Sequence, residues 1–395
     1  MSTTRKTPKL RFPEFTGDWE QRELGEIAEK VTKKNSNLEI SETFTNSAEQ
    51  GIISQKDFFD HKVASSENIG NYYVVDKNDF VYNPRISTTA PVGPINRNRL
   101  GRAGVMSPLY TVFRAKDINQ LFLEWYFKSS CWHLFMYFNG DSGARSDRFS
   151  IKDSVFFSMP IFVPSKEEQF KIGRFFDQLN ETITLHQREL DSLKKLKKSL
   201  LQKMFPKNGE KIPELRFPEF TGDWEQRKVT DLGEIYIGLV TTMTEHYTDE
   251  GHLLIRNSDI KDGYFEFGGN PIYLDKEFSE QNKSRMHQLG DVITVHTGDI
   301  GTSAVIGENE VNSIGFATIV TRPNQEVLDS YYFATYLNTD VHKQWAISMA
   351  TGDGRSNYNL KDYTKLMVPT PQIEEQKKIA ECIGNLNNLI TLHQR

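Results

Sequence analysis

Cysteine is scarce in this chain of 395 residues, which has only Cys131 and Cys382. They lie far apart and show no metal or redox spacing, so a disulfide framework is excluded and a reducing, cytoplasmic location is expected. Long apolar runs are also missing, because no stretch approaches the roughly 18 residues of a membrane-spanning helix. The first residues lack the apolar segment of a signal peptide. We therefore expect no membrane partner.

Cofactor motifs are missing too. No Gly-x-Gly-x-x-Gly follows a predicted strand, and no Walker A sequence occurs. Thr297-Gly298-Asp299-Ile300-Gly301 could cradle a phosphate, but a hairpin turn between two strands explains it better. We expect no catalytic, cofactor-binding or metal-binding residue. Five histidines show no ligand spacing, and most of them are expected at the surface: His61, His246, His252, His287 and His296.

Excess positive charge is absent as well, since 53 acidic residues outnumber 48 basic ones and the net charge is −5. This balance argues against a uniformly basic nucleic-acid binder but leaves local basic faces open. The aromatic side chains, with 26 Phe, 15 Tyr and 5 Trp, are numerous enough for two or more hydrophobic cores.

The chain does contain a long internal repeat. Residues 10–22 recur without change as residues 215–227, Glu-Glu-Gln at 167–169 recurs at 374–376, and residues 183–188 recur as 390–395. A period of about 206 residues indicates duplicated domains, because it is far longer than that of any stacked repeat. Between the repeated blocks, residues 28–140 and 235–350 share almost nothing, so one scaffold is predicted to present two different binding surfaces.

Each copy mixes short strands with helices. Strands are predicted at 72–75, 80–82, 109–113, 252–255, 291–295 and 304–306, with an extended, proline-flanked segment at 159–164. A helix is expected over residues 119–138 and another over residues 329–347.

A long helix is predicted at the end of each copy. In the first, Ser165 and Glu168 have the spacing of a capping box, and Pro206 and Gly209 end the helix. Apolar residues spaced by four and three form the seam of a coiled coil. The first seam is Ile172, Phe176, Leu179, Ile183, His186, Leu190, Leu193, Lys197, Leu200 and Met204, and the second is Ile379, Ile383, Leu386, Ile390 and His393. The second helix has no counterpart of residues 189–205, so we expect it to be either truncated or naturally short.

Connectivity predicts how these helices pack. The first helix leads to the second domain and the second leaves it, so packing through the matching seams makes the pair antiparallel. His186 and His393 occupy equivalent positions and are expected to meet, where a polar pair would help to fix the register.

We therefore predict a mixed α/β (α+β) protein with a pseudo-two-fold internal repeat. Two recognition domains would be separated by a long antiparallel two-helix coiled coil. The predicted parts are residues 1–164 (first domain), 165–206 (first spacer helix), 207–370 (second domain) and 371–395 (second spacer helix).

A local cluster of basic residues is a candidate DNA surface. Residues 85–116 contain five arginines and one lysine but no acid, and arginine can contact phosphates or read guanine. Loops that hold Arg-Ser pairs at equivalent places in both copies suit a shared contact with a DNA backbone. The first domain's candidates are Arg85, Ser87, Arg97, Asn98, Arg99, Arg102, Arg145, Ser146 and Arg148. The second domain's are Arg256, Asn257, His296, Thr297, Arg355, Ser356, Asn357 and Tyr358.

These features together resemble the specificity subunit of a Type I restriction–modification enzyme, over essentially the whole chain. The resemblance rests on the repeated Phe-Pro-Glu-Phe-x-x-x-Trp opening and on Gly-Asp-Val-Ile-Thr-Val-His-Thr-Gly-Asp-Ile-Gly at 290–301. It also rests on Ser-Pro-Leu-Tyr at 107–110 and on the Pro-x-x-Glu-Glu-Gln-x-x-Ile start of both helices, at 164–172 and 371–379. The short second helix departs from the family's pattern.

The resemblance implies that two domains each read one half of a bipartite site in double-stranded DNA, while the helices set the unread gap. It implies two modification (methyltransferase) subunits and the restriction subunits as partners, which carry S-adenosylmethionine, ATP and Mg²⁺. Two alternatives stay open. Asn83-Pro84-Arg85-Ile86 weakly resembles the Asn-Pro-Pro-aromatic loop of amino-methyltransferases, so the chain could be a self-contained methyltransferase. It could also be a coiled-coil scaffold that binds only proteins.

Overall fold

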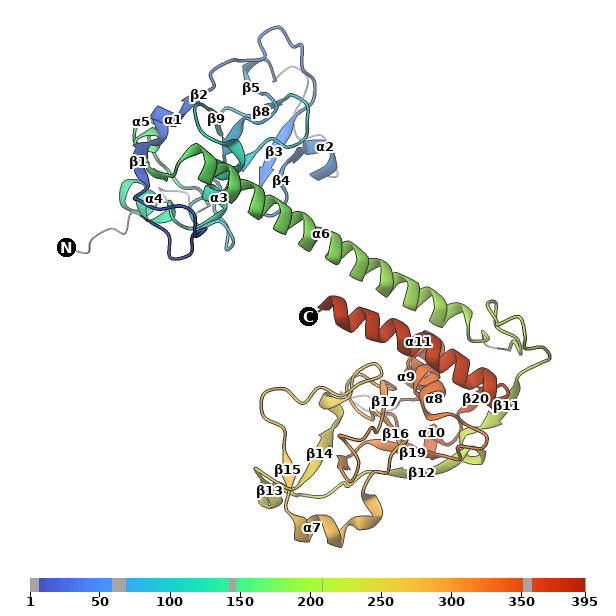
Figure 1. Ribbon diagram of the computed structural model, residues 1–395. Coiled ribbons are helices and arrows are strands. Elements are labelled where there is room, and N and C mark those ends of the chain that lie inside the picture. Colours follow the sequence, from blue (N-terminus) through green and yellow to red (C-terminus); the bar gives the residue numbers. More distant parts are fainter. Residues whose placement is uncertain (1–6, 59–68, 142–146, 208, 351–356, 395) are drawn as a thin grey trace. The chain divides into compact units, whose positions relative to one another are not determined.

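The computed structural model describes residues 7–58, 69–141, 147–207, 209–350 and 357–394. It contains two compact units, residues 1–184 and residues 185–395, which we call unit 1 and unit 2 (Figure 1). The boundary between them falls inside the long helix α6, Lys166–Lys203. Among the described residues, no helix is both long and apolar enough to cross a membrane.

Unit 1 places its short helices around antiparallel strand pairs. Its elements before α6 are β1 (Glu20–Glu23), α1 (Leu24–Ile27), β2 (Ala28–Lys30), β3 (Phe44–Ser47), β4 (Gly51–Ser54), α2 (Gln55–Phe58), β5 (Tyr73–Val75), β6 (Phe80–Tyr82), β7 (Ile95–Arg97), β8 (Gly104–Met106), β9 (Thr111–Ala115), α3 (Gln120–Lys128), α4 (His133–Asn139), α5 (Asp153–Phe157) and β10 (Pro160–Val163).

The main sheet of unit 1 has the strand order β2-β9-β6-β7 and is antiparallel throughout. Phe80 on β6 is paired with Phe113 on β9, and their rings stack with centroids 5.4 Å apart. Phe127 of α3, Trp132 and Phe156 of α5 pack into the same core, so helices cover one face of the sheet.

Unit 2 follows the same plan after α6. Its elements are β11 (Glu225–Lys228), β12 (Gly233–Ile237), β13 (Tyr247–Thr248), β14 (His252–Arg256), β15 (Tyr273–Leu274), α7 (Lys276–Gln281), β16 (Val292–Thr294), β17 (Ser303–Val305), β18 (Ile314–Phe316), β19 (Ile319–Pro323), α8 (Ser330–Leu337), α9 (Asp340–Met349), α10 (Leu360–Tyr363), β20 (Met367–Thr370) and α11 (Ile373–Gln394).

The main sheet of unit 2 has the order β12-β19-β16-β17, which matches the sheet of unit 1 strand for strand. The flanking pairs match as well, because β1 pairs with β10 as β11 pairs with β20, both antiparallel. The two inserts therefore share a strand order although their sequences share almost nothing. The two inserts therefore correspond to each other by the positions of their strands in the sheet and not by residue identity.

The repeated sequence blocks hold the start of each long helix. The Arg11 guanidinium donates to both carboxylate oxygens of Glu168 at 2.7 Å and to the carbonyl oxygen of Gly17. Arg216 makes the same bonds to Glu375, at 2.8 Å, and to Gly222. Because both glutamates are buried, these ion pairs explain why the Arg-containing block and the Glu-Glu-Gln block are repeated together.

The glutamine of the second block links the long helix to a short one. Gln169 Nε2 donates to the carbonyl oxygen of Pro164, and its Oε1 accepts from the backbone nitrogen of Asn119, which caps α3. Gln376 bonds to Pro371 and to Asp329, the cap of α8, in the same way. The repeated residues thus build the frame around each unit.

Within unit 2, the second half of α6 packs antiparallel to α11, as the sequence predicts. His186 contacts His393 near one end of the pair, while Lys197 and Leu201 face Ile383 and Ala380 toward the other end. Leu190, Ile379, Ile383 and Leu386 are buried. The seam positions that belong to unit 1 differ, because the side chains of Phe176, Leu179 and Ile183 remain 41–59% exposed.

Both predicted single helices are wrong in one respect, since each is a pair of shorter helices. Ser129 ends α3 by donating its hydroxyl to the carbonyl of Tyr126 at 2.6 Å, and α4 begins at His133. In unit 2, Thr339 caps α9 by accepting from the backbone nitrogen of His342. Hydroxyl side chains that bond to the local backbone compete with helix continuation, which explains both breaks.

Candidate nucleic-acid interface

Two loops meet in unit 1 where β6 ends. Arg85, just after β6, forms an isolated antiparallel bridge with Arg148, which precedes α5. The carbonyl oxygen of Pro84 accepts from the backbone nitrogen of Phe149 at 2.7 Å, and that of Asp147 accepts from Ile86 at 3.0 Å. Two of the predicted DNA-binding arginines, 63 residues apart in sequence, are therefore brought together.

The equivalent loops meet in unit 2 where β16 ends. Thr297 forms an isolated antiparallel bridge with Asn357, and the backbone nitrogen of Tyr358 donates to the carbonyl oxygen of His296 at 2.9 Å. Because β6 and β16 hold the same place in their sheets, these two loop pairs are equivalent. Each unit therefore presents one candidate site in the same position.

The unit 2 site is a chain of polar side chains, in which Asn257, His296, Thr297 and Asn357 meet. Asn257 Oδ1 accepts from the backbone nitrogen of His296 at 2.7 Å, and its Nδ2 donates to the carbonyl oxygen of Ala317. Thr297 Oγ1 donates to Asn357 Oδ1 at 2.7 Å and lies 2.7 Å from His296 Nδ1. All four side chains are half-buried, so they can combine fixed orientation with access to a ligand.

The hydrogen-bond roles determine the His296 tautomer. Because Thr297 Oγ1 donates to Asn357, it serves as the acceptor for His296, so Nδ1 carries the proton and Nε2 is an acceptor. Burial lowers the pKa of His296, which keeps the ring neutral near pH 7. The site thus offers hydrogen-bonding groups of the kind that discriminate base edges.

The unit 1 site uses asparagines and arginines instead. Asn83 Nδ2 donates to the carbonyl oxygen of Asn46 at 2.8 Å, and its Oδ1 accepts from the backbone nitrogen of Arg85. The amide of Asn96 donates to Asn46 Oδ1 at 2.6 Å. Since the Asn83 amide bonds to β3 at one end and to its own loop at the other, Asn83 holds this loop against the strand.

The side chains above this asparagine network are accessible. The side chain of Arg85 is 69% exposed and lies 3.6 Å from Asp147, and Arg148 is half-buried. Ser87 is exposed, and its hydroxyl accepts from the backbone nitrogen of Ala90. Arg85, Ser87 and Arg148 therefore keep their place as candidates. Sequence reasoning missed Asn46 and Asn96, and an asparagine within a short polar strand gave no distinctive signal.

The assignment of Arg97 and Arg99 to a DNA surface needs correction. The side chain of Arg97 is only 10% exposed, and its Nε donates to Glu124 Oε2 at 2.7 Å. Arg99 pairs with the same buried carboxylate at 2.8 Å and with Asp177 of α6. These arginines connect β7 and the loop after it to α3 and α6, so their charge is used inside unit 1.

Two further arginines of the basic stretch, Arg102 and Arg114, also have acidic partners. Arg102 makes two 2.7 Å bonds to Glu42, and Arg114 pairs with Asp79 at 2.7 Å and with Asp76. A stretch without acids in sequence is thus neutralised by acids from elsewhere in the fold. The stretch is therefore less positive in the fold than its sequence alone indicates, and half-exposed Arg102 stays a prediction.

Two further candidates, Asn98 and Tyr358, are also corrected. Asn98 is fully buried and donates to the carbonyl oxygens of Asp76 and Arg102, and Tyr358 is fully buried in the core of unit 2. Arg256 makes a bidentate pair with Asp259, at 3.0 and 2.8 Å, immediately after β14. The fully buried Asn98 and Tyr358 cannot reach a ligand, whereas the Arg256 side chain is 38% exposed and stays a prediction.

Several predicted residues lie outside the part of the chain that the structure describes: Arg145, Ser146, Arg355, Ser356 and His61. Most of the histidines without ligand spacing were expected at the surface, and His287 is the buried exception among the described ones. It is 1% exposed, its Nδ1 lies 2.8 Å from the Ser313 hydroxyl, and burial lowers its pKa to about 3. Thr297–Gly301 joins β16 to β17, which confirms the predicted hairpin.

The family described as "Type I restriction modification DNA specificity domain" matches the chain twice, over residues 16–195 and 221–395. The specificity subunit of the Type I restriction enzyme EcoBI from Escherichia coli is 27% identical over 137 residues. This match covers 35% of the chain but only 29% of that subunit. The MjaVIII specificity subunit from Methanocaldococcus jannaschii is 21% identical over 98% of the chain and 89% of that protein.

Two solved structures have a similar fold. The S subunit of a Type I restriction–modification system from M. genitalium matches with a TM-score of 0.59 and 14% identity, over 98% of this chain and 94% of that one. A chain from a structural study of complex assembly and conformational transition in the type I R-M system matches with a TM-score of 0.51 and 15% identity. That match covers 98% of this chain and 93% of the other. Both likenesses support the mixed helix and sheet architecture.

Proposed function

Because this chain belongs to the Type I restriction modification DNA specificity domain family, we propose that it reads a bipartite, asymmetric DNA site. Each unit would recognise one half-site through the loop pair described above. The observation that carries this proposal is the equivalence of the two loop pairs in position combined with their difference in chemistry. Identical positions suit one mode of docking, and different side chains suit different base sequences.

The chemistry of the two loop pairs supports unequal half-sites. In unit 2, the neutral side chains of His296 and Asn357 can supply hydrogen-bonding groups, while the Asn257 amide holds the backbone of His296 in place. In unit 1, exposed Arg85 adds a cation that can contact a phosphate or read guanine in the major groove. Different sets of donors and acceptors select different bases, so the whole site would be asymmetric.

We propose that the long helices set the distance between the half-sites. The antiparallel packing of α6 on α11 within unit 2 supports this role, and helices are stiff over their length. Patches that read one face of a duplex are best spaced by about 34–36 Å, one helical turn. The unread gap of the DNA site would follow from this spacing.

We further propose that the chain is not catalytic by itself and acts with partner subunits. Two modification subunits would bring S-adenosylmethionine, and restriction subunits would bring ATP and Mg²⁺. Large apolar side chains on α6 offer a docking surface, since Phe175, Leu179 and Ile183 are 50%, 44% and 59% exposed. Such a row of exposed apolar side chains is typical of a protein interface.

Selection of bound duplexes from a random pool by the chain with its modification subunits tests the proposal. We expect two short fixed motifs separated by a gap of constant length. The variant Asn357→Ala should relax only the motif read by unit 2. Selection of no DNA would favour a protein-only scaffold, and methylation by the purified chain alone would favour a self-contained methyltransferase.

A further inference from the structure

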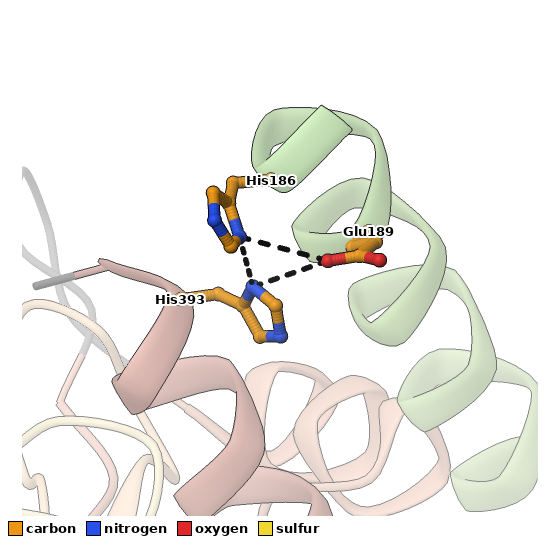
Figure 2. Close-up of side chains that lie close together, drawn as sticks. All are labelled: His186, Glu189 and His393. Carbon is orange, nitrogen blue, oxygen red and sulfur yellow. Dashed lines mark hydrogen bonds and ion pairs between the residues drawn. The ribbon is translucent and has the colours of Figure 1, made fainter. Parts of the chain in front are cut away.

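Three potential metal ligands meet where α6 and α11 come together in unit 2. His186 Nδ1 lies 3.4 Å from His393 Nδ1, and Glu189 Oε2 lies 3.6 Å from the first ring nitrogen and 3.7 Å from the second (Figure 2). His186 and Glu189 are neighbours on one face of α6, while His393 comes from the last turn of α11. Among the described residues, this is the one group of three such side chains whose ligand atoms all lie close together.

We propose that these three side chains bind a divalent transition metal ion, with Zn²⁺ as the natural candidate. A point equidistant from the three ligand atoms lies about 2.1 Å from each, which is the length of Zn–N and Zn–O bonds. Two imidazoles and one carboxylate are a known zinc ligand set, and a water molecule completes a tetrahedron. Small side-chain rotations suffice to lift the ion out of the ligand plane.

The donor set also determines which ions are rejected. Imidazole nitrogen suits Zn²⁺, Co²⁺, Ni²⁺ and Cu²⁺, whereas Mg²⁺ and Ca²⁺ require oxygen ligands. The site is open to solvent, since the side chains of His186, Glu189 and His393 are 56%, 47% and 23% exposed. An ion can therefore enter and leave without unfolding the helices.

A bound ion would join two segments that are 207 residues apart in sequence. The histidines occur in the same hexapeptide, residues 183–188 and 390–395, so the internal repeat supplies one ligand to each helix. The ion would fix the register of the antiparallel pair and hold the last turn of α11, where helix ends otherwise fray. Because the ligands lie at the two ends of the segment from His186 to His393, metal binding would be coupled to the folding of unit 2.

The competing account is a polar pair without metal, in which one imidazole donates to the other. Titration of the full chain, free of any histidine tag, with Zn²⁺ and Co²⁺ separates the two. We expect one equivalent of either metal to bind, Co²⁺ to give visible absorption of a tetrahedral site, and Mg²⁺ to have no effect. Micromolar Zn²⁺ should raise the Tm of unit 2 by roughly 5 °C when it is in large excess over the Kd.

Variants assign the ligands. His186→Ala and His393→Ala should each weaken binding at least tenfold, and Glu189→Gln should weaken it less while shifting the Co²⁺ spectrum. The matched control is His246→Gln, because His246 pairs with Asp275 at 2.8 Å but belongs to no group of three potential ligands among the described residues. Hydrogen exchange in the last turn of α11 should slow when Zn²⁺ is added to the unmodified chain.

The proposal is overturned if the unmodified chain binds no Zn²⁺ at 100-fold excess, or if both histidine variants bind it as tightly as the parent.

Discussion

Units 1 and 2 share the same frame but have different side chains in the loops that form their candidate sites. The buried pairs Arg11–Glu168 and Arg216–Glu375 are the same to within 0.1 Å, and the sheets have matching strand orders. Where β6 and β16 end, however, one unit has asparagines and exposed Arg85, and the other has a network centred on His296 and Thr297. The frame keeps the position of the site constant, and the loops are free to vary because they contribute little to the shared core.

The largest effect is expected when the site of unit 1 is replaced by the site of unit 2. Replacing residues 28–149 with residues 233–358 keeps both repeated blocks and should convert the first half-site completely into a copy of the second. The ends of the two inserts match because Phe149 and Tyr358 have equivalent positions. The backbone nitrogen of each donates to a carbonyl oxygen of the loop that follows β6 or β16. DNA selection with the chimera is the measurement. A change in the half-site of the untouched unit would show that the two units do not read independently.

The next largest effects are expected when arginines of unit 1 are replaced. Loss of a structural arginine should lower stability, and loss of a DNA-facing arginine should lower DNA affinity. Arg97→Ala leaves the buried carboxylate of Glu124 with fewer partners and should cost about 3 kcal/mol of stability. Arg85→Ala, at an exposed position, should leave stability unchanged and weaken DNA binding. Denaturant unfolding and DNA titration of both variants form the check. Loss of stability in the Arg85 variant alone would reverse our assignment.

Acid should destabilise unit 2 through two buried histidines. Burial lowers the pKa of His287 to about 3 and of His342 to about 4, below the ordinary value of about 6.5. Between its folded and its unfolded pKa, each histidine therefore binds more protons in the unfolded chain than in the folded one. The free energy of unfolding decreases as the pH falls below about 6.5. The two groups together should lower the free energy of unfolding by roughly 2–3 kcal/mol between pH 7.5 and 5.5.

The matched variants for this prediction are His287→Gln and His342→Asn in one chain, with His252→Gln as a surface control. The double variant is less stable at pH 7.5 but should lose most of the acid dependence in this range. A smaller part remains, because burial also lowers the pKa of His296. Urea unfolding monitored at both pH values gives the slope. An unchanged slope in the double variant would assign the acid sensitivity to other groups.

The smallest expected effects concern single contacts in the two sites. Thr297→Val removes the hydroxyl that links His296 to Asn357 and should cost about 1–3 kcal/mol in discrimination at one base pair of the second half-site. Arg148→Gln in unit 1 should lower the slope of log affinity against log salt by about one, if this arginine contacts a phosphate. Equal effects on both half-sites from either variant would argue against one unit per half-site.

Much of the frame was predictable from sequence, because it depends on local rules and exact repetition. The capping hydroxyl of Ser165 does accept from the backbone nitrogen of Glu168, and α6 ends before Pro206. The meeting of His186 and His393 followed from the repeat and the connectivity, and it is confirmed with ring centroids 5.5 Å apart. Each of these features needs only spacing along the chain and one packing argument.

The binding surface was predictable only in part, because charge and burial depend on distant residues. Arg97 and Arg99 lie in a stretch without acids, yet Glu124 and Asp177 reach them from two helices. Conversely, the grouping of Asn257, His296, Thr297 and Asn357 follows from sheet order, which no pattern in the sequence specifies. The carboxylate of Glu189 was likewise missed as a companion of the two histidines, although its place three residues after His186 puts both on one face of α6.

The central claim is that each unit reads one half of a divided DNA site, and a map of modified bases tests it most directly. Cells that express this chain with its modification subunits would be compared with cells that express the chimera carrying the unit 2 insert twice. The account predicts a methylated motif with two unlike halves and a fixed unread gap, and then a motif whose two halves are alike. A single continuous motif, or one that the chimera leaves unchanged, would contradict it.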